Sequence, residues 1–127
     1  ADRISPWLIL RFCTSPLGRR MAKANRCHKL YRETQFMIGV PACEVSDVRS
    51  REMILIQGVI DACFEEDGQI ILVEYKTDFV KEGNEEVLIR RYEKQLYYYE
   101  KAIEQLTGRK VSEKYIYSFA LNRPVSV

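Results

Sequence analysis

A pair of acidic residues and a lysine lie within two apolar segments of the chain that a short turn separates. These residues are Asp61, Glu74 and Lys76. The turn is Asp67-Gly68, a dipeptide suited to a two-residue β-turn because glycine adopts positive φ without a steric cost. The pattern predicts a β-hairpin with strands over residues 52–65 and 69–77. All three charged residues lie within those strands.

The hairpin register predicts that Asp61 and Glu74 face each other. A two-residue turn places Glu66 opposite Gln69, and the same register continued along the strands places Asp61 opposite Glu74. Facing side chains in an antiparallel pair have Cβ atoms about 4.5–5.5 Å apart, where two like charges destabilise the sheet. Burial among apolar neighbours also opposes ionisation. A divalent cation removes both penalties, because carboxylates are hard oxygen ligands suited to Mg²⁺ or Mn²⁺.

Lys76 extends this candidate metal site. It follows Glu74 by two residues and therefore projects from the same face of the strand. An ammonium group there can orient or deprotonate water and can stabilise charge on a phosphoryl oxygen. The backbone carbonyl of Tyr75, between the two side chains, is a candidate further metal ligand. A glutamate and a lysine at this spacing also commonly form a surface ion pair worth about 0–1 kcal/mol. The facing Asp61 favours the metal site over that alternative.

Basic residues cluster in the N-terminal quarter of the chain. They include Arg19, Arg20, Lys23 and Arg26. Two interpretations stay open for them: a solvated face of a helix, and contact with the phosphates of a nucleic acid. The formal net charge of +2, from 20 Lys and Arg against 18 Asp and Glu, does not decide between these interpretations.

The remaining sequence predicts a sheet flanked by helices. Helices are expected over residues 5–13, 17–30 and 84–106, and strands over 33–45, 52–65, 69–77 and 114–121, with a further strand beginning within 124–127. Ser5 and Asn84 are the expected N-caps, and Gly108 follows the end of the long helix. This order, ααβββαβ, predicts an α/β (α+β) fold with a central mixed sheet of about four to five strands.

Length and composition favour one globular domain over residues 1–127, with 46% hydrophobic and 30% charged residues. The four cysteines lack the spacing of a zinc or iron–sulfur site, and we expect them to be reduced and partly buried. No apolar segment approaches the about 20 residues of a membrane span, so we expect a cytoplasmic protein that does not associate with a membrane.

The chain begins at Ala1 and contains no phosphate-binding GxxxxGK[ST] loop. We therefore expect a fragment of a larger protein, in which any ATP-driven motor lies outside these residues.

The segment QGVIDACFEEDGQIILVEYKTD resembles the core of the PD-(D/E)xK nuclease superfamily, in its RecB-like branch. Within that branch, nearly the whole chain is similar to the C-terminal nuclease domains of bacterial helicase-nucleases of the AddA type. Four segments carry this closer resemblance: LYRETQFMIGVPA, IQGVID, LVEYKTD and YEKQLYYYEKAIEQL. The resemblance implies a restriction-endonuclease-like core and hydrolysis of phosphodiesters with Mg²⁺, for which Mn²⁺ can substitute.

The resemblance also implies roles for individual residues. Asp61 stands at the family's first acid position, Glu74 at the second and Lys76 at its lysine. An Ile-Asp dipeptide replaces Pro-Asp, and Glu replaces the Asp frequent at the second position; both are tolerated variants. Gln95 and Tyr99 match the branch's Q-x-x-x-Y motif, and their helical spacing would let both reach a DNA phosphate or the lysine. Core packing is the alternative for Tyr99.

Glu33 and His28 are the remaining polar residues that the resemblance brings into question. Glu33 resembles a recurrent acid of this subfamily, and an ion pair with Lys76 or a basic helix residue is the alternative. His28 is not assigned as a ligand, because the family's histidine belongs to a separate upstream motif. We expect it at the surface or at the end of a helix.

The predicted function is hydrolysis of DNA phosphodiesters, as the exonuclease of an ATP-dependent helicase-nuclease in double-strand break repair and recombination. Expected partners are DNA, the helicase portion of the same polypeptide and a second helicase-nuclease subunit. Asp61 and Glu74 hold the metal, Lys76 helps to activate water, and Arg19 and Lys23, with Arg20, contact the DNA backbone. Two alternatives stay open: a catalytically inactive module that binds or channels DNA or docks a partner subunit, and a restriction-type endonuclease.

Overall fold

The structure is a computed structural model of the chain, and it describes residues 5–45 and 52–127. Its elements, in order, are α1 (Pro6–Thr14), α2 (Pro16–Arg26), β1 (Leu30–Pro41), α3 (Ala42–Val45), β2 (Met53–Glu66), β3 (Gln69–Lys76), α4 (Glu85–Thr107), β4 (Val111–Ser118) and β5 (Arg123–Ser126). The prediction of a central mixed sheet flanked by helices is confirmed, and the arrangement is consistent with a restriction-endonuclease-like fold.

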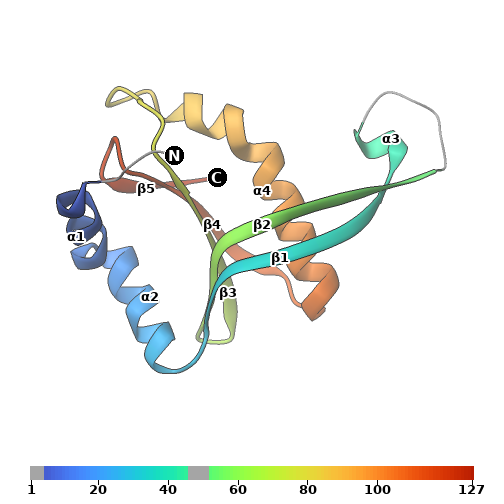
Figure 1. The fold of residues 1–127 in the computed structure, drawn as a ribbon, viewed down its shortest axis with the longest axis horizontal. Helices are drawn as coiled ribbons and strands as arrows, with labels where there is room; N and C mark the ends of the chain where they lie inside the picture. The colour runs from blue at the N-terminus through green and yellow to red at the C-terminus, as the bar shows by residue number, and fades with distance from the viewer. Residues whose placement is uncertain (1–4, 46–51) are drawn as a thin grey trace.

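The five strands form one sheet in the order β1-β2-β3-β4-β5. β3 and β4 run parallel, and the pairs β1–β2, β2–β3 and β4–β5 run antiparallel. The parallel pair needs a long crossover connection, which contains α4. α1 and α2 lie on one side of β3 and β4, and α4 lies on the other side (Figure 1).

Each face of the sheet has its own hydrophobic core, because successive side chains of a strand point to opposite faces. In β3, Ile70 and Leu72 pack in the core under α4, whereas Ile71 and Val73 pack in the core under α2. The alternation continues to Glu74, which therefore enters the layer under α4. The sheet thus positions an acidic side chain inside an apolar core.

The turn of the hairpin and its register both agree with the prediction. Asp67 and Gly68 have φ values of 52° and 77°, and positive φ at both positions is the property of a type I′ turn. The residues on either side of the turn, Glu66 and Gln69, face each other, and the same register continues as far as Ala62. The predicted register is therefore confirmed for this ladder.

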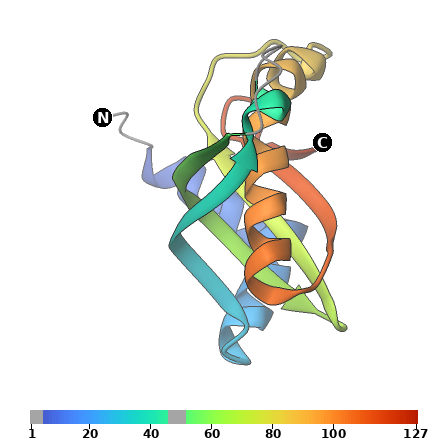
Figure 2. The ribbon, with the colours of Figure 1, turned by 90° about the vertical axis from the view of Figure 1, so that its right-hand side faces the viewer.

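β1 and β2 bend together and leave the rest of the sheet (Figures 1 and 2). β2 pairs with β1 over nearly its whole length, but with β3 only from Ala62 onward. The β1–β2 ladder is interrupted between Arg32 and Thr34, and Glu33 between them has a φ of 51°. Positive φ is uncommon outside glycine. The bend separates β2 from β3 beside Asp61.

The predicted end of the second helix is wrong: α2 ends at Arg26 and not at residue 30. His28 has a φ of 57°, and the backbone N–H of Lys29 donates to the carbonyl of Ala24 at 2.8 Å. A left-handed residue with this hydrogen bond ends a helix. Leu30, at which the helix was predicted to end, instead begins β1.

Two predicted strands are displaced along the sequence. The strand predicted over residues 33–45 ends at Pro41, and α3 follows it. Proline has no N–H to donate to a ladder. The strand predicted over residues 114–121 begins and ends three residues earlier, because its last predicted residues form the turn into β5. The strand expected to begin within 124–127 is present as β5, which begins one residue earlier, at Arg123.

Two of the three expected helix-end contacts are present. The hydroxyl of Ser5 accepts a hydrogen bond from a backbone N–H of α1 at 3.3 Å, and Gly108 ends α4 with a φ of 71°. Asn84 occupies the N-cap position of α4, but its side chain makes no capping hydrogen bond. The carboxylate of Glu85 instead accepts one from the N–H of Gly83 at 3.3 Å.

The cysteines agree only in part with the expectation that they are reduced and partly buried. All four cysteines are free; Cys63 is buried, but the other three are exposed and not partly buried as expected.

Within residues 5–45 and 52–127, no helix is both long enough and apolar enough to cross a membrane.

Gly58 of β2 lies where the bent strands meet α4. A Cβ atom added there would be 3.1 Å from the ring of Phe36 and 3.5 Å from the ring of Tyr99. Gly58→Ala is expected to lower the free energy of unfolding by about 1–2 kcal/mol in urea titrations, because buried rings must move. Gly39→Ala is the matched control: its Cβ would meet the flexible end of Met53 at 3.2 Å, so we expect a loss below about 0.5 kcal/mol. Equal losses would contradict this interpretation.

Candidate active site

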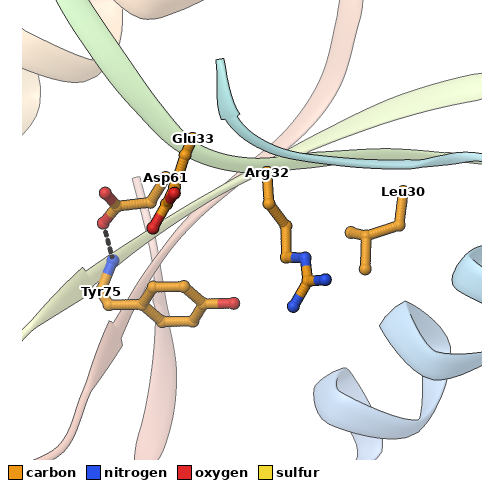
Figure 3. Close-up of a pocket in the computed structure, with 5 residues that line it drawn as sticks. All are labelled: Leu30, Arg32, Glu33, Asp61 and Tyr75. Carbon is orange, nitrogen blue, oxygen red and sulfur yellow. Dashed lines mark hydrogen bonds between the residues drawn. The ribbon is translucent and has the colours of Figure 1, made fainter.

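Asp61 lies at the point where β2 leaves β3. Its Oδ2 accepts a hydrogen bond of 3.0 Å from the backbone N–H of Tyr75 (Figure 3). The register would place Asp61 opposite Glu74, but the ladder ends one pair earlier, at Ala62 and Val73. The half-buried carboxylate of Asp61 therefore takes the place of a strand carbonyl as the acceptor for this N–H.

Glu74 carries the buried carboxyl group of the site. It is 4% exposed, and its Oε2 has no hydrogen-bond partner among the described residues. Burial, a hydrogen bond with the Asp61 carboxyl group and the negative charge of Asp61 raise the pKa of Glu74 to about 9. The positive charge of Lys76 acts in the opposite direction. The two acids thus lie together, and this environment favours the protonated form of Glu74.

Lys76 lies on the same face of β3 as Glu74, but its ammonium group contacts an aromatic ring. The Nζ atom is 4.1 Å from the centroid of the Tyr92 ring on α4. In the part of the chain that the structure describes, Lys76 forms no ion pair with a carboxylate. The lysine is therefore close enough to lower the pKa of Glu74 without being paired to it.

Gln95 and Tyr99 lie one turn apart on α4 and approach the two acids. Gln95 Nε2 donates to the hydroxyl of Tyr99 at 2.8 Å, and Gln95 Oε1 is buried without a partner among the described residues. Burial and the nearby charge of Glu74 raise the pKa of Tyr99. Tyr99 also packs edge to face on Phe36, with ring centroids 5.3 Å apart. Its phenol reaches the site while its ring belongs to the core.

A pocket of about 780 Å³ opens beside Asp61 at the bend of β1 and β2. Its lining residues are Leu30, Arg32, Glu33, Asp61 and Tyr75 (Figure 3). Burial and the charge of Asp61 raise the pKa of Tyr75 to about 12, and the charge of Arg32 opposes that shift. Glu33 is exposed and lies across the interrupted ladder from Asp61. The pocket therefore contains two acids and one guanidinium group.

The donors of this site fit a divalent cation. Asp61 and Glu74 present carboxylate oxygens, one of them buried without a partner, and Mg²⁺ commonly binds one or two carboxylates together with several waters. No group of three His, Cys, Asp or Glu side chains arranged to hold a metal occurs within residues 5–45 and 52–127. The protein would thus supply two carboxylates, with the carbonyl of Tyr75 and water as further oxygen donors.

The basic residues predicted to contact DNA fall into two groups. Arg20 forms ion pairs with Glu66 at 2.8 Å and with Glu113 at 3.2 Å, which join α2 to the hairpin and β4. Arg19 and Lys23 are exposed on α2. The structure gives Arg20 partners within the fold and presents the other two side chains to solvent. His28 is exposed just after α2, as expected for a helix-end histidine.

Three residues near the site received no role from the sequence. They are Arg32, Asp78 and Tyr92. Tyr92 precedes Gln95 by three residues and Tyr99 by seven, so helical periodicity places all three on one face of α4. This spacing, read together with Gln95 and Tyr99, was enough to indicate that Tyr92 lies beside the site. Arg32 and Asp78 lie within two of the segments that carry the family resemblance, but their places beside the site depend on the bend of β1 and on α4.

The fold and the site together define a protein of the α+β class. Its mixed five-stranded sheet is flanked by helices, and a hairpin brings two carboxyl groups and a lysine beside the crossover helix.

Comparison with known proteins shows that this chain is similar to part of the ATP-dependent helicase/nuclease of several Clostridium species, in the subunit designated A. It is 43% identical over 129 residues to that protein from Clostridium beijerinckii (strain ATCC 51743 / NCIMB 8052), and this alignment covers 98% of the chain. It is 40% identical over 132 residues to the protein from Clostridium novyi (strain NT), which covers 100% of the chain. Each match covers 10% of the relative, so the chain spans about a tenth of the length of the curated relatives it matches. No protein-family model matches the chain.

Proposed function

We propose that this chain is a metal-dependent DNA nuclease domain of the PD-(D/E)xK superfamily, in its RecB-like branch, and that it hydrolyses phosphodiester bonds. The observation that carries the proposal is the meeting of Asp61 with the buried Glu74 beside Lys76. Two acids in contact inside a core destabilise the fold when both are ionised. Such an arrangement is explained by a cation that binds both groups.

Asp61 and Glu74 would hold Mg²⁺, or Mn²⁺ in its place, with the carbonyl of Tyr75 as a third protein donor. When bound, the ion would neutralise the two carboxylates, lower the pKa of a coordinated water and stabilise negative charge on a phosphoryl oxygen. Glu33 lines the pocket beside Asp61 and is a further candidate acid of the site.

The remaining residues would position the DNA and the attacking water. The ammonium group of Lys76 can orient water and stabilise the charge that develops on phosphorus oxygens. The amide of Gln95 and the phenol of Tyr99 approach from α4 and would contact the phosphate or the lysine. Arg19 and Lys23 on α2 would contact the DNA backbone without reading its bases. Arg20 supports that surface through its ion pairs.

The names of the relatives support a proposal for the biological setting. Their names describe them as one subunit of an ATP-dependent helicase/nuclease, and this chain matches about a tenth of each. We therefore propose that the domain is the exonuclease of a helicase-nuclease that acts in double-strand break repair and recombination. Its partners would be DNA, the helicase portion of the same polypeptide and a second helicase-nuclease subunit.

A cleavage assay with paired asparagine variants tests the proposed activity. End-labelled single-stranded and duplex DNA are incubated with the chain in Mg²⁺, Mn²⁺ or EDTA. Asp61→Asn is expected to lower the cleavage rate by at least about 10³-fold, because it removes one of two charged ligands. Asp67→Asn makes the same chemical change in the exposed turn of the same hairpin, where asparagine tolerates positive φ, and is expected to retain the wild-type rate.

Each outcome of this assay separates the nuclease from its alternatives. DNA binding without cleavage in either metal would indicate an inactive module that binds or channels DNA. Fragments of defined sequence would indicate a restriction-type endonuclease. Cleavage that persists in Asp61→Asn, or in EDTA, would contradict the proposed site.

A further inference from the structure

The ammonium group of Lys76 contacts an aromatic ring, although an acid lies on the same face of its strand. The positive charge of Lys76 lowers the pKa of Glu74, so the two side chains would attract each other once Glu74 is ionised. The Nζ atom instead lies 4.1 Å from the centroid of the Tyr92 ring, and within the described part of the chain it pairs with no carboxylate.

The Tyr92 ring can hold this position because the face of an aromatic ring is electronegative and attracts a cation. The distance from the Lys76 Nζ atom to the ring centroid is well below the about 6 Å within which such contacts are favourable. Another lysine, Lys101 of α4, lies 5.1 Å from the centroid of the Tyr97 ring, but it is also paired with Glu44 at 3.0 Å. Lys101 thus has a carboxylate partner as well as a ring contact, whereas Lys76, among the described residues, has the ring contact without an ion pair.

Tyr92 is itself fixed in place by its hydroxyl group. The hydroxyl donates to Asp78 Oδ2 at 2.7 Å, and the same oxygen accepts from Arg91. Asp78 follows Lys76 by two residues, in the segment that leaves β3, and Tyr92 lies on α4. The hydrogen bond thus fixes the ring relative to the strand end that carries the lysine.

We propose that Tyr92 is a positioning residue that holds the Lys76 ammonium group away from Asp61 and Glu74, so that both carboxylates are left for a divalent cation and the lysine is left for the substrate phosphate. The inference rests on the proposed function. Without the ring, Lys76 would turn toward the two acids, form an ion pair and compete with the cation. Tyr92 itself touches neither the cation nor the DNA in this arrangement.

Nuclear magnetic resonance tests the position of the ammonium group independently of activity. In the 127-residue chain with ¹³C-labelled lysine, the Hε protons of Lys76 are expected upfield of the other lysines, because protons above a ring face are shielded. Lys76→Met identifies the resonance. Tyr92→Phe is expected to retain the shift because it keeps the ring, and Tyr92→Leu to abolish it. Tyr97→Leu is the matched control and is expected to move only the Lys101 resonance.

Calorimetric titration with Mn²⁺ tests the consequence. Tyr92→Leu is expected to raise the Kd for Mn²⁺ by about tenfold, because the released lysine competes for the carboxylates. Adding Lys76→Met to Tyr92→Leu is expected to restore the Kd to within about twofold of Lys76→Met alone, since no ammonium group remains to compete. Tyr97→Leu is expected to bind Mn²⁺ like the wild type. A purely structural role for Tyr92 would not give rescue by removal of the lysine.

Two results would overturn the inference: an unshifted Lys76 resonance in the wild type, or wild-type Mn²⁺ affinity in a folded Tyr92→Leu chain. If Tyr92→Leu does not fold, Tyr92→Met replaces it and is judged by the same two measurements. A wild-type chain that binds no Mn²⁺ but shows the shifted Lys76 resonance would instead reject the proposed function. The two failures are thus distinguishable.

Discussion

Glutamine in place of Glu74 is expected to make the metal-free chain more stable while removing its cleavage activity. Burial, the hydrogen bond with Asp61 and the charge of Asp61 raise the pKa of Glu74 to about 9. The folded chain therefore keeps a proton on Glu74 between about pH 4.5 and pH 9, whereas the unfolded chain loses it. The free energy of unfolding falls as the pH rises through this window, because unfolding releases the proton.

A glutamine side chain does not ionise in the unfolded state, and its amide can donate to Asp61 as the protonated acid does. Glu74→Gln is thus expected to raise the free energy of unfolding by about 2–4 kcal/mol at pH 8 in EDTA, and by little at pH 4.5. Urea titrations at the two pH values measure the difference. DNA cleavage in Mg²⁺ is expected to fall by at least about 10³-fold, because a charged ligand is lost.

Addition of Mn²⁺ provides the internal control for this prediction. The ion is expected to stabilise the wild type, by mass action on the folded state, but not Glu74→Gln. Glu104→Gln is the matched control in a half-buried position on α4, away from the hairpin acids; we expect it to leave cleavage unchanged. A Glu74→Gln chain that is less stable than the wild type at pH 8 would show that the carboxyl group contributes to the metal-free fold.

The affinity for a divalent cation is expected to rise steeply with pH. A cation binds the ionised form of Glu74, and the raised pKa of about 9 means that binding must displace a proton at every lower pH. The Kd for Mn²⁺ is therefore expected to fall about tenfold for each pH unit, and about a hundredfold between pH 6 and pH 8.

Calorimetry in buffers of different ionisation enthalpy measures this effect directly, because the heat of binding then reports the number of protons released. About one proton per Mn²⁺ is expected at pH 7. A Kd that does not change between pH 6 and pH 8, or binding without proton release, would mean that the cation does not bind Glu74.

The hairpin and its acids were predictable from the sequence because local chemistry decides them. Asp67-Gly68 adopts the two positive φ values of a tight turn, and this turn sets the register of the strands on both sides. Alternation then places Glu74 in the buried layer. The C-terminal end of α4 was predictable for the same reason, since Gly108 takes the left-handed conformation that ends a helix.

The sequence does not predict features that depend on contacts between segments distant in the chain. The predicted helix extended to Leu30, yet this residue belongs to β1, because the left-handed His28 ends the helix and directs the chain to the sheet. The sequence does not distinguish Arg20 from the other basic residues of α2. Only the folded structure places Glu66 and Glu113 beside it. Neither outcome follows from the residues next to these positions.

The sequence by itself determined which side chains meet in the hairpin, because a two-residue turn leaves one register and each strand has a period of two. Only the tertiary structure decided how those side chains are used. The bend of β1 and β2 ends the ladder before Asp61 and turns its carboxylate to the N–H of Tyr75. The packing of α4 brings the ring of Tyr92 under Lys76. These contacts depend on segments far apart in the chain, whose approach is set by the packing of whole elements and not by local backbone preference.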